Sequence, residues 1–495
     1  MRRGASWLAA AFALLAMTGC GDREPATASG SGAAAPVLQG PLFATPPNVL
    51  MISLDTTRAD RLGAYGNARG LTPNLDALAA RAALFEDCMT ASTLTGPSHR
   101  SLFTGQYVER HGLPGNATTG KLDYSLASLL KARGYATASF VGGGSLFRGS
   151  GLDLGFDTYW QWANLVVLEP GQKFPAPGEA SAARTAKGMI KVSVDKALGW
   201  LDGTWKAEAA DQPFFVFVHG YDPHCPYAPG HEARGALSSW HQDPLGLDGL
   251  CGPEQFSPLF RSGELDADGL RYVNDLYDEL IVAADHEIGR LIAGLEERGL
   301  ADDTLVVFSS DHGECLGEHQ RVGHGRILPE ETRIPLLLAF PDGRFAGRYA
   351  APVASVDVLP TLLDALGGEA PAASQGRSLL PVLGGALPPR EAGMRVVRSG
   401  RRSGALIDER WLVLVDHGEK NQVPPTLFDF PADPELEHNL AGTPEGREAL
   451  GGLLARYRAW MEAAQTGVAA EQGPLDPGVA ADLGALGYVE GDDGK

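Results

Sequence analysis

Short apolar runs alternate with amphipathic stretches along most of the chain. The runs "NVLMISL", "PFFVFVHG", "DTLVVFS" and "RIPLLLAF" are short and rich in β-branched and aromatic residues, which is typical of buried strands. Between them, "TPNLDALAARAALF", "YSLASLLKARG" and "YDELIVAADHEIGRLIAGLEERG" space their apolar residues for one helical face. This alternation predicts an α/β fold over residues 47–365, in which a mostly parallel central sheet is sandwiched by helices.

The pattern changes after about residue 366. Four short runs at hairpin spacing, "MRVVRSG", "GALIDE", "RWLVLVD" and "TLFDF", precede the amphipathic stretch "EGREALGGLLARYRAWMEAA". They predict a C-terminal subdomain, residues 366–471, made of a small antiparallel sheet plus a helix. Residues 472–495 are acidic and poorly patterned, so we expect a tail.

The N-terminus has the features of an export signal. Arg2 and Arg3 precede an apolar run that ends in "AMTGC" at Cys20. We interpret residues 1–20 as a lipoprotein-type signal peptide with a lipid anchor at Cys20; an ordinary cleaved signal is the alternative. Residues 21–46 are rich in Ala, Gly, Ser and Pro, which is typical of a flexible linker. We therefore expect an exported protein of the periplasm or cell envelope that touches the membrane only through the anchor.

The amino-acid composition limits the classes of molecule that the protein can bind. The net charge is −20 and no basic stripe is present, so nucleic acid is excluded as a partner. We expect a small anionic ester, or an envelope glycan or lipid; the sequence does not indicate an oligomeric state. The cysteines after Cys20 fit no zinc motif, but Cys225 and Cys251 bracket a Pro/Gly-rich loop and are a candidate disulfide.

Acidic and imidazole side chains follow the predicted strands or lie beside Gly and Pro. They are Asp55, Asp222, His224, Asp311, His312 and His324. Because ligands of parallel sheets bind at the carboxyl ends of the strands, we expect these side chains to converge. This mixture of oxygen and nitrogen ligands suits zinc, manganese or a similar divalent ion.

The stretch "TLTGPSHRSLFTG" predicts a helix that begins near Thr95, with Pro97 in its first turn. Backbone amides and the helix dipole favour negative charge at such a position. A hydroxyl there would be easier to deprotonate, particularly beside a cation. The alternative is that Thr95 simply caps the helix.

The chain resembles the sulfatase family of the alkaline phosphatase superfamily over roughly residues 46–465. The resemblance is carried, in family order, by "PNVLMISLDTTRADRLGAYG", "LTPNLDALAARAALFEDC", "TGPSHRSLFTG", "PFFVFVHGYDPHCPY", "LVVFSSDHGECLGEH", "GHGRILPEETRIPLLL", "VDVLPTLLDALGG" and "TLFDFPADPELEHNLA". It implies an alkaline-phosphatase-like fold and a metal-dependent hydrolase of phosphoric or sulfuric esters.

Departures from the family pattern concern the nucleophile and the ligands. Formylglycine sulfatases carry Cys-x-Pro-x-Arg or Ser-x-Pro-x-Arg, and the alignment puts Thr95 at the first position and His99 at the arginine. Threonine cannot become formylglycine. The family's Asp-Asn pair is here Asp311-His312, and its sulfate-contacting lysine is His324. These changes favour zinc or manganese, with calcium or magnesium possible, in one or two sites.

The resemblance also implies roles. Asp55, Asp311 and His312 would hold the metal that activates Thr95, which would itself be a ligand. Asp222, His224 and His324 would bind a second metal or the substrate anion, and His224 would protonate the leaving group. His99 would orient the nucleophile turn or contact the anion, and Arg58 would form a salt bridge.

The favoured function is therefore hydrolysis of phosphate monoesters or diesters with Thr95 as nucleophile. Three alternatives remain: a sulfatase that works without formylglycine, a phosphoethanolamine- or phosphoglycerol-type transferase, and a non-catalytic glycan-binding relative.

Overall fold

The structure is a computed structural model that describes residues 41–162, 189–227, 235–238, 243, 245–385, 395–400, 403–417 and 423–465. All of them belong to one compact unit, Pro36–Lys495. The expected signal peptide, nearly all of the expected linker and the expected acidic tail lie outside the described residues. No helix within the described ranges is both long enough and apolar enough to cross a bilayer.

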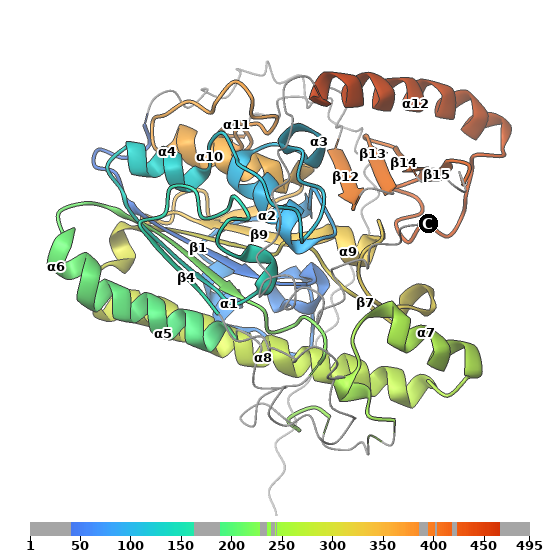
Figure 1. The fold of residues 1–495 in the computed structure, drawn as a ribbon, viewed down its shortest axis with the longest axis horizontal. Helices are drawn as coiled ribbons and strands as arrows, with labels where there is room; N and C mark the ends of the chain where they lie inside the picture. The colour runs from blue at the N-terminus through green and yellow to red at the C-terminus, as the bar shows by residue number, and fades with distance from the viewer. Residues whose placement is uncertain are drawn as a thin grey trace, which may run out of the picture. The chain divides into compact units, whose positions relative to one another are not determined.

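A nine-stranded sheet forms the centre of the molecule (Figure 1). Its order is β10-β2-β9-β6-β1-β5-β3-β4, and β11 pairs with β2. The strands are β1 (Asn48–Leu54), β2 (Ala83–Met89), β3 (Ala136–Val141), β4 (Thr158–Gln161), β5 (Phe214–Gly220), β6 (Thr304–Ser309), β9 (Arg333–Ala339), β10 (Gly347–Tyr349) and β11 (Val353–Ala354). Only β9 runs antiparallel to its neighbours. The predicted mostly parallel sheet is therefore confirmed.

Helices cover both faces of this sheet, because alternate residues of each buried strand point to opposite sides. Leu50, Ile52 and Leu54 pack with one set of helices, whereas Val49 and Met51 pack with the other. The first set is α1 (Pro73–Ala79), α5 (Ile190–Trp200) and α8 (Ala267–Glu297), and the second is α2 (Thr95–Thr104), α4 (Leu126–Ala132), α10 (Val358–Ala365) and α11 (Leu380–Leu383). Figure 1 shows α5 and α8 below the sheet and α4 and α10 above it.

Shorter elements complete the large layer. They are α3 (Val108–His111), α6 (Lys206–Glu208), α7 (Gly252–Ser262), α9 (Pro329–Thr332) and the two-stranded β7 (Cys315–Leu316) and β8 (Val322–Gly323). The β7–β8 ribbon follows β6 directly, and α7 contacts β8. The β7–β8 ribbon and α7 therefore lie beyond the carboxyl end of β6.

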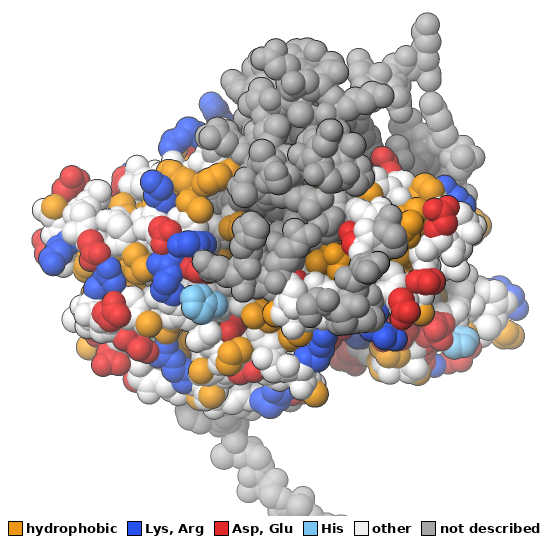
Figure 2. Space-filling model, turned by 90° about the horizontal axis from the view of Figure 1, so that it is seen from below, with side chains coloured by type: hydrophobic (Ala, Val, Ile, Leu, Met, Phe, Trp, Pro, Cys, Tyr) orange, Lys and Arg blue, Asp and Glu red, His pale blue; other side chains and the backbone are white. Residues whose placement is uncertain are grey.

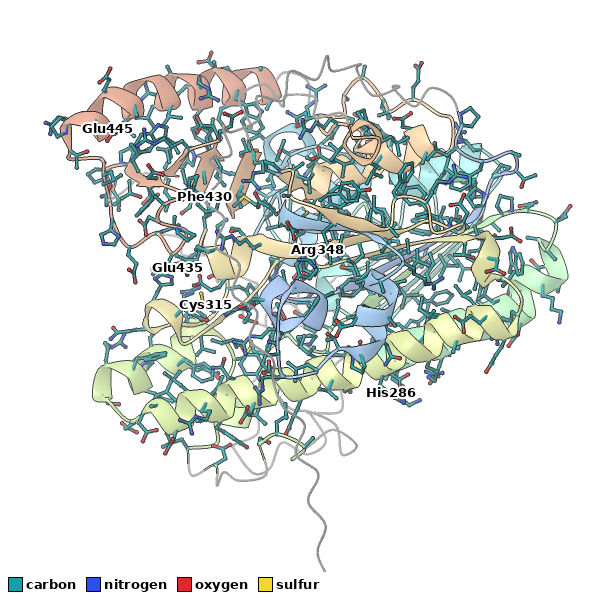
Figure 3. The ribbon with its side chains drawn as sticks, turned by 180° about the vertical axis from the view of Figure 1, so that it is seen from behind. His286, Cys315, Arg348, Phe430, Glu435 and Glu445 are labelled. Atoms are coloured by element: carbon teal, nitrogen blue, oxygen red, sulfur yellow. A yellow bond between two sulfur atoms is a disulfide. The ribbon has the colours of Figure 1, made fainter. Side chains whose placement is uncertain are left out.

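The C-terminal part is a second, antiparallel sheet with one long helix. Its strands are β12 (Arg395–Ser399), β13 (Ser403–Ile407), β14 (Trp411–Asp416) and β15 (Thr426–Asp429), and the helix is α12 (Pro444–Gln465). Figure 3, seen from behind, labels Phe430 just beyond β15, where the guanidinium of Arg333 stands over its ring at 5.1 Å. The predicted small sheet plus helix is confirmed.

One predicted helix is shorter than its sequence pattern suggested. The amphipathic stretch 72–85 forms α1 only as far as Ala79, and Ala83 already belongs to β2. Both neighbouring strands hydrogen-bond to β2, since Ala83 stands opposite Leu338 of β9 and Gly347 of β10. Pairing within the sheet therefore overrides the helical spacing of the last apolar residues.

Candidate active site

Three central strands end at the same edge of the sheet. β6, β1 and β5 are parallel neighbours, and Ser53 of β1 stands beside both Ser309 and His219. The chain leaves β1 into Asp55 and leaves β6 into Asp311. The Asp55 amide donates to the carbonyl of Gly220, at 2.9 Å. The strand exits thus hold the two carboxylates side by side.

Asp55, Asp311 and His312 form a group of possible metal ligands. One ligand atom from each lies within 4.8 Å of the others, and all three side chains are buried. Neither oxygen of Asp55, nor Oδ2 of Asp311, accepts a hydrogen bond of ordinary geometry from any described residue. Because burying unpaired charge is costly, this oxygen and nitrogen set fits a divalent cation.

The two carboxylates differ in their surroundings. Oδ1 of Asp311 accepts the amides of Thr56, at 3.0 Å, and His312, at 2.9 Å, which leaves Oδ2 for a cation. Burial opposes ionisation, but the imidazoles of His312, His99 and His219 hold the pKa of Asp311 well below its usual value. Burial, and then the charge of Asp311, raise the pKa of Asp55 well above its usual value. A cation between them would relieve that repulsion.

His312 is oriented by its backbone. Its Nδ1 lies 3.0 Å from the carbonyl oxygen of Gly313, an acceptor, so the proton is on Nδ1 and Nε2 carries a lone pair. This is the arrangement of metal-binding imidazoles, whose other nitrogen donates to a carbonyl or carboxylate. Burial lowers the pKa of His312, which keeps the ring neutral and able to bind a cation.

Thr95 lies at the start of α2, next to this group. It is the first helical residue, one position after Leu94, and its side chain is buried. Its Oγ1 stands 3.5 Å from Nε2 of His312. Capping does not account for this hydroxyl, because Leu94 occupies the capping position. Thr95 is therefore placed to act on whatever binds beside His312.

We expected backbone amides without partners at the start of this helix, but one of them already donates a hydrogen bond. The Gly96 amide donates to Oδ1 of Asn116, at 2.8 Å, and Pro97 has no N–H. The side-chain amide Nδ2 of Asn116 is buried and finds no hydrogen-bond partner among the described residues. An anion beside Thr95 would therefore meet a side-chain donor in place of the Gly96 amide.

His99 faces the protein interior from α2. Its Nδ1 lies 2.8 Å from the carbonyl oxygen of Thr95, and its Nε2 lies 3.0 Å from Oγ of Ser53. Nδ1–H therefore donates to Thr95, and the Ser53 hydroxyl donates to Nε2. Both ring nitrogens tie the turn that carries Thr95 to β1, which agrees with the expected orienting role more than with contact to an anion.

His224 and His324 lie in line with His312. The ring centroids of His312 and His324 are 4.4 Å apart, and those of His324 and His224 are 5.0 Å apart. Nδ1 of His324 lies 3.0 Å from Oε1 of the buried Glu314, and Nδ1 of His224 lies 2.6 Å from the carbonyl of Cys225. These contacts hold both rings in a fixed orientation, with His324 next to His312.

Asp222 is placed differently from the other predicted ligands. Its Oδ2 accepts the amide of Ile190, at 2.7 Å, at the first residue of α5. Asp222, His224 and His324 do not form a three-donor group among the described residues. Asp222 thus holds the start of a helix, and the two histidines remain as the second cluster.

Two structural predictions near the site are confirmed. Cys225 and Cys251 form a disulfide, which fixes the residue after His224 to the start of α7. Arg58 forms ion pairs with Asp60 and Glu318, at 2.7 Å each.

Three residues near the site were not singled out from the sequence. Arg100 donates to the carbonyls of Gly115, Thr118 and Ser150, at 2.7 to 3.0 Å, and so holds the loop that carries Asn116. His219 ends β5 beside Asp55, with Nε2 3.5 Å from Oδ2. A buried Arg, a loop Asn and a His within a strand have no sequence pattern that marks them.

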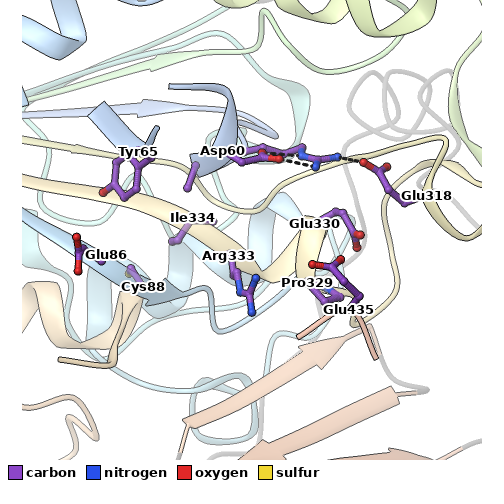
Figure 4. A pocket seen from close by; sticks show the side chains of 12 residues that line it. Asp60, Tyr65, Glu86, Cys88, Glu318, Pro329, Glu330, Arg333, Ile334 and Glu435 are labelled. Atoms are coloured by element: carbon purple, nitrogen blue, oxygen red, sulfur yellow. Dashed lines mark hydrogen bonds and ion pairs between the residues drawn. The ribbon is translucent and has the colours of Figure 1, made fainter. Parts of the chain in front are cut away.

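A separate cavity of about 390 Å³ lies near the start of β9. Its lining includes Arg58, Glu318, Glu330, Arg333 and Glu435. Arg58 is already paired with Asp60 and Glu318, and dashed lines at the labelled Asp60 and Glu318 mark these ion pairs in Figure 4. None of the metal-group residues or Thr95 lines this cavity.

Comparisons with known proteins agree with this geometry. The family model described as Sulfatase matches residues 47–368. "Multifunctional alkaline phosphatase superfamily protein PehA" of Trinickia caryophylli is 30% identical over 479 residues, covering 81% of this chain and 92% of that protein. N-acetylglucosamine-6-O-sulfatase of Bacteroides thetaiotaomicron is 27% identical over 406 residues, covering 68% and 71%.

Solved structures share the fold. A phosphonate monoester hydrolase of Agrobacterium radiobacter superposes with a TM-score of 0.67 at 22% identity, covering 85% of this chain and 96% of that one. A protein solved with D-glucosamine-2-N,6-O-disulfate gives a TM-score of 0.66 at 21% identity, covering 85% and 98%. These likenesses show the fold.

Proposed function

The chain belongs to the sulfatase family and is a hydrolase of sulfuric or phosphoric esters; we propose that it acts on phosphate esters with Thr95 as the nucleophile. The observation that carries this proposal is the position of the Thr95 hydroxyl, 3.5 Å from Nε2 of His312 and beside the buried Asp55 and Asp311. A threonine cannot become the formylglycine aldehyde on which sulfatases of the usual kind depend. Its hydroxyl can attack phosphorus directly.

A divalent metal is required in this family, and the buried group Asp55, Asp311 and His312 fits one. We favour zinc or manganese, because one ligand is an imidazole. When bound, the ion would make the Thr95 hydroxyl easier to deprotonate and would offset negative charge on the ester oxygens.

The residues then carry out a double displacement. Oγ1 of Thr95 loses its proton to solvent and bonds to phosphorus, while the bond from phosphorus to the leaving oxygen breaks. His224, protonated on Nε2, gives a proton to that oxygen and takes up another from solvent. Water next attacks phosphorus, the bond to Thr95 breaks, and Oγ1 regains a proton.

Other groups hold the anion during both steps. Nδ2 of Asn116 would donate to a non-bridging oxygen, since it is buried with no described partner. We assign His224 and His324 to the anion and leaving group, because no third described ligand joins them in a metal group. His99 would keep the Thr95 carbonyl, and so the turn, in place.

The direct test compares Thr95→Ala and Thr95→Ser on bis-p-nitrophenyl phosphate and on p-nitrophenyl sulfate. We expect Thr95→Ala to lower kcat by roughly a thousandfold or more on the phosphate, because the nucleophile is lost. Thr95→Ser should keep measurable turnover. Circular dichroism would verify that both variants fold.

The sulfatase alternative rests on relatives such as the N-acetylglucosamine-6-O-sulfatase. It predicts that wild-type protein turns over the aryl sulfate faster than the phosphate. That result would overturn the choice of phosphorus, and unchanged turnover in Thr95→Ala would overturn the role of Thr95.

A further inference from the structure

The imidazole of His219 is buried and forms no hydrogen bond with the described residues. It lies next to the last residue of β5, its side chain is inaccessible, and neither ring nitrogen has a hydrogen-bond partner among the described residues. A neutral imidazole has one N–H donor and one acceptor. Leaving a buried donor unsatisfied destabilises the folded protein. A strand position between apolar residues would ordinarily hold an apolar side chain, so the presence of an imidazole here requires an explanation.

A carboxylate oxygen of Asp55 lies close to this imidazole. Nε2 of His219 lies 3.5 Å from Oδ2 of Asp55, and both oxygens of Asp55 lack ordinary hydrogen bonds from described residues. The ring also meets that of His99 edge-on, with centroids 5.0 Å apart. His219 therefore stands behind Asp55, on the side of the nucleophile helix.

The two carboxylates of the candidate metal site differ in their hydrogen-bond donors. Asp311 has two backbone amides on Oδ1, which fix its orientation. Asp55 has no such donor. The imidazole of His219 can supply one, because its Nε2 lies 3.5 Å from Oδ2 of Asp55.

His219 does not belong to the ligand group itself. The three side chains whose ligand atoms lie within 4.8 Å of one another are Asp55, Asp311 and His312, and His219 is not among them. Its Nε2 lies 3.5 Å from Oδ2 of Asp55, and its imidazole also acts electrostatically on Asp311.

We propose that His219 is a positioning residue for the metal site, whose Nε2–H donates to Oδ2 of Asp55 and turns Oδ1 toward the cation. At 3.5 Å, a small rotation of the carboxylate closes an ordinary hydrogen bond. Hydrogen bonds to ligating carboxylates orient the ligand and are typically worth about 10- to 100-fold in metal affinity. The inference rests on the proposed metal site and not on the nature of the ester.

The test measures metal binding without substrate. His219→Leu removes the donor at similar volume, whereas His219→Gln keeps an N–H near the position of Nε2. We would measure the dissociation constant for Zn²⁺ and Mn²⁺ by chelator competition on metal-free full-length protein, and Tm with and without metal. His111→Gln is the matched control, because His111 is also buried but bonds to Ser101 on α2 and touches none of the metal group.

The proposal predicts that His219→Leu weakens metal binding by about 10- to 100-fold, whereas His219→Gln stays within about threefold of wild type. Metal-free His219→Leu should be no less stable than wild type, because an unsatisfied donor is replaced by an apolar group. The control should lower both Tm values alike. Wild-type affinity in His219→Leu, or an equal fall of its Tm with and without metal, would overturn the proposal. Neither readout depends on which ester the protein cleaves.

Discussion

At the scale of single residues, the proposed preference for zinc or manganese rests on His312. Its Nδ1–H is held by the carbonyl of Gly313, so the Nε2 lone pair points to Asp311 and Thr95, at 3.5 Å each. An imidazole nitrogen is a poor ligand for calcium and a good one for zinc. The family's usual asparagine would offer an oxygen instead.

Replacing that one nitrogen should change the metal preference. In His312→Asn, we expect the ratio of Zn²⁺ to Ca²⁺ affinity to fall by at least about tenfold, because an oxygen replaces a nitrogen ligand. Isothermal titration of both ions into metal-free protein measures the ratio. The control is His417→Asn, whose ring bonds to Tyr457 in the C-terminal subdomain. An unchanged ratio in His312→Asn would mean that His312 is not a ligand.

The sequence predicted some site residues better than others. Asp55 and Asp311 follow buried strands, so their meeting at one edge of the sheet could be foreseen. The pairing of His219 with Asp55 could not, because it depends on the register between β1 and β5. The use of Asp222 at the start of α5 also depends on a contact with Ile190, 32 positions earlier in the chain.

At the scale of elements, the loop after β5 depends on its disulfide. The bond between Cys225 and Cys251 closes a loop with a sequence separation of 26, and Cys225 also accepts the contact from His224 through its carbonyl. The covalent link therefore restrains the residue that orients one of the two histidines of the second cluster.

Removing the disulfide should affect both stability and turnover. The double variant Cys225→Ala/Cys251→Ala should lose about 3 kcal/mol of unfolding free energy, because the unfolded chain is no longer restrained. kcat should fall severalfold as the His224 ring loses its fixed place. Urea unfolding and steady-state kinetics measure the two effects, with Cys88→Ala as the cysteine control. A stability loss with full kcat would show that His224 does not need the disulfide.

Elements that rely on local pattern were predictable, and those that rely on pairing were not. The apolar runs of β1, β5, β6 and β9 were recognised because each is a short buried strand. β2 was hidden within a helical spacing, since its strand state comes from pairing with β9 and β10. The direction of β9 likewise follows from its partners and not from its own residues.

At the scale of the whole molecule, the C-terminal subdomain contacts the segment that leads to Thr95. The Arg398 amide donates to the carbonyl of Ala91, at 3.0 Å, and the Thr93 amide donates to the carbonyl of Arg398, at 3.1 Å. The Arg398 side chain also pairs with the buried Glu109 of α3, at 3.0 Å. β12 thus pairs through its backbone with the segment that leads to Thr95. The C-terminal subdomain therefore helps to hold the candidate site in place.

The surface agrees with a small substrate. On the face below α5 and α8, acidic and basic side chains are interspersed (Figure 2), and the described residues of that face form no basic stripe. The net charge of the chain is −20. We therefore expect attraction for the proposed anionic ester to be local, from the candidate metal site, the imidazoles of the second cluster and Asn116.

The most direct measurement is to trap the covalent intermediate. Wild-type protein turning over bis-p-nitrophenyl phosphate would be quenched in acid within milliseconds and digested, and its peptides would be weighed by mass spectrometry. We predict a phosphorus-containing adduct on the peptide that holds Thr95, with fragment ions that place it on Thr95 and with none in Thr95→Ala. Turnover with no adduct at Thr95 under any quench time, or an adduct on another residue, would contradict Thr95 as the nucleophile.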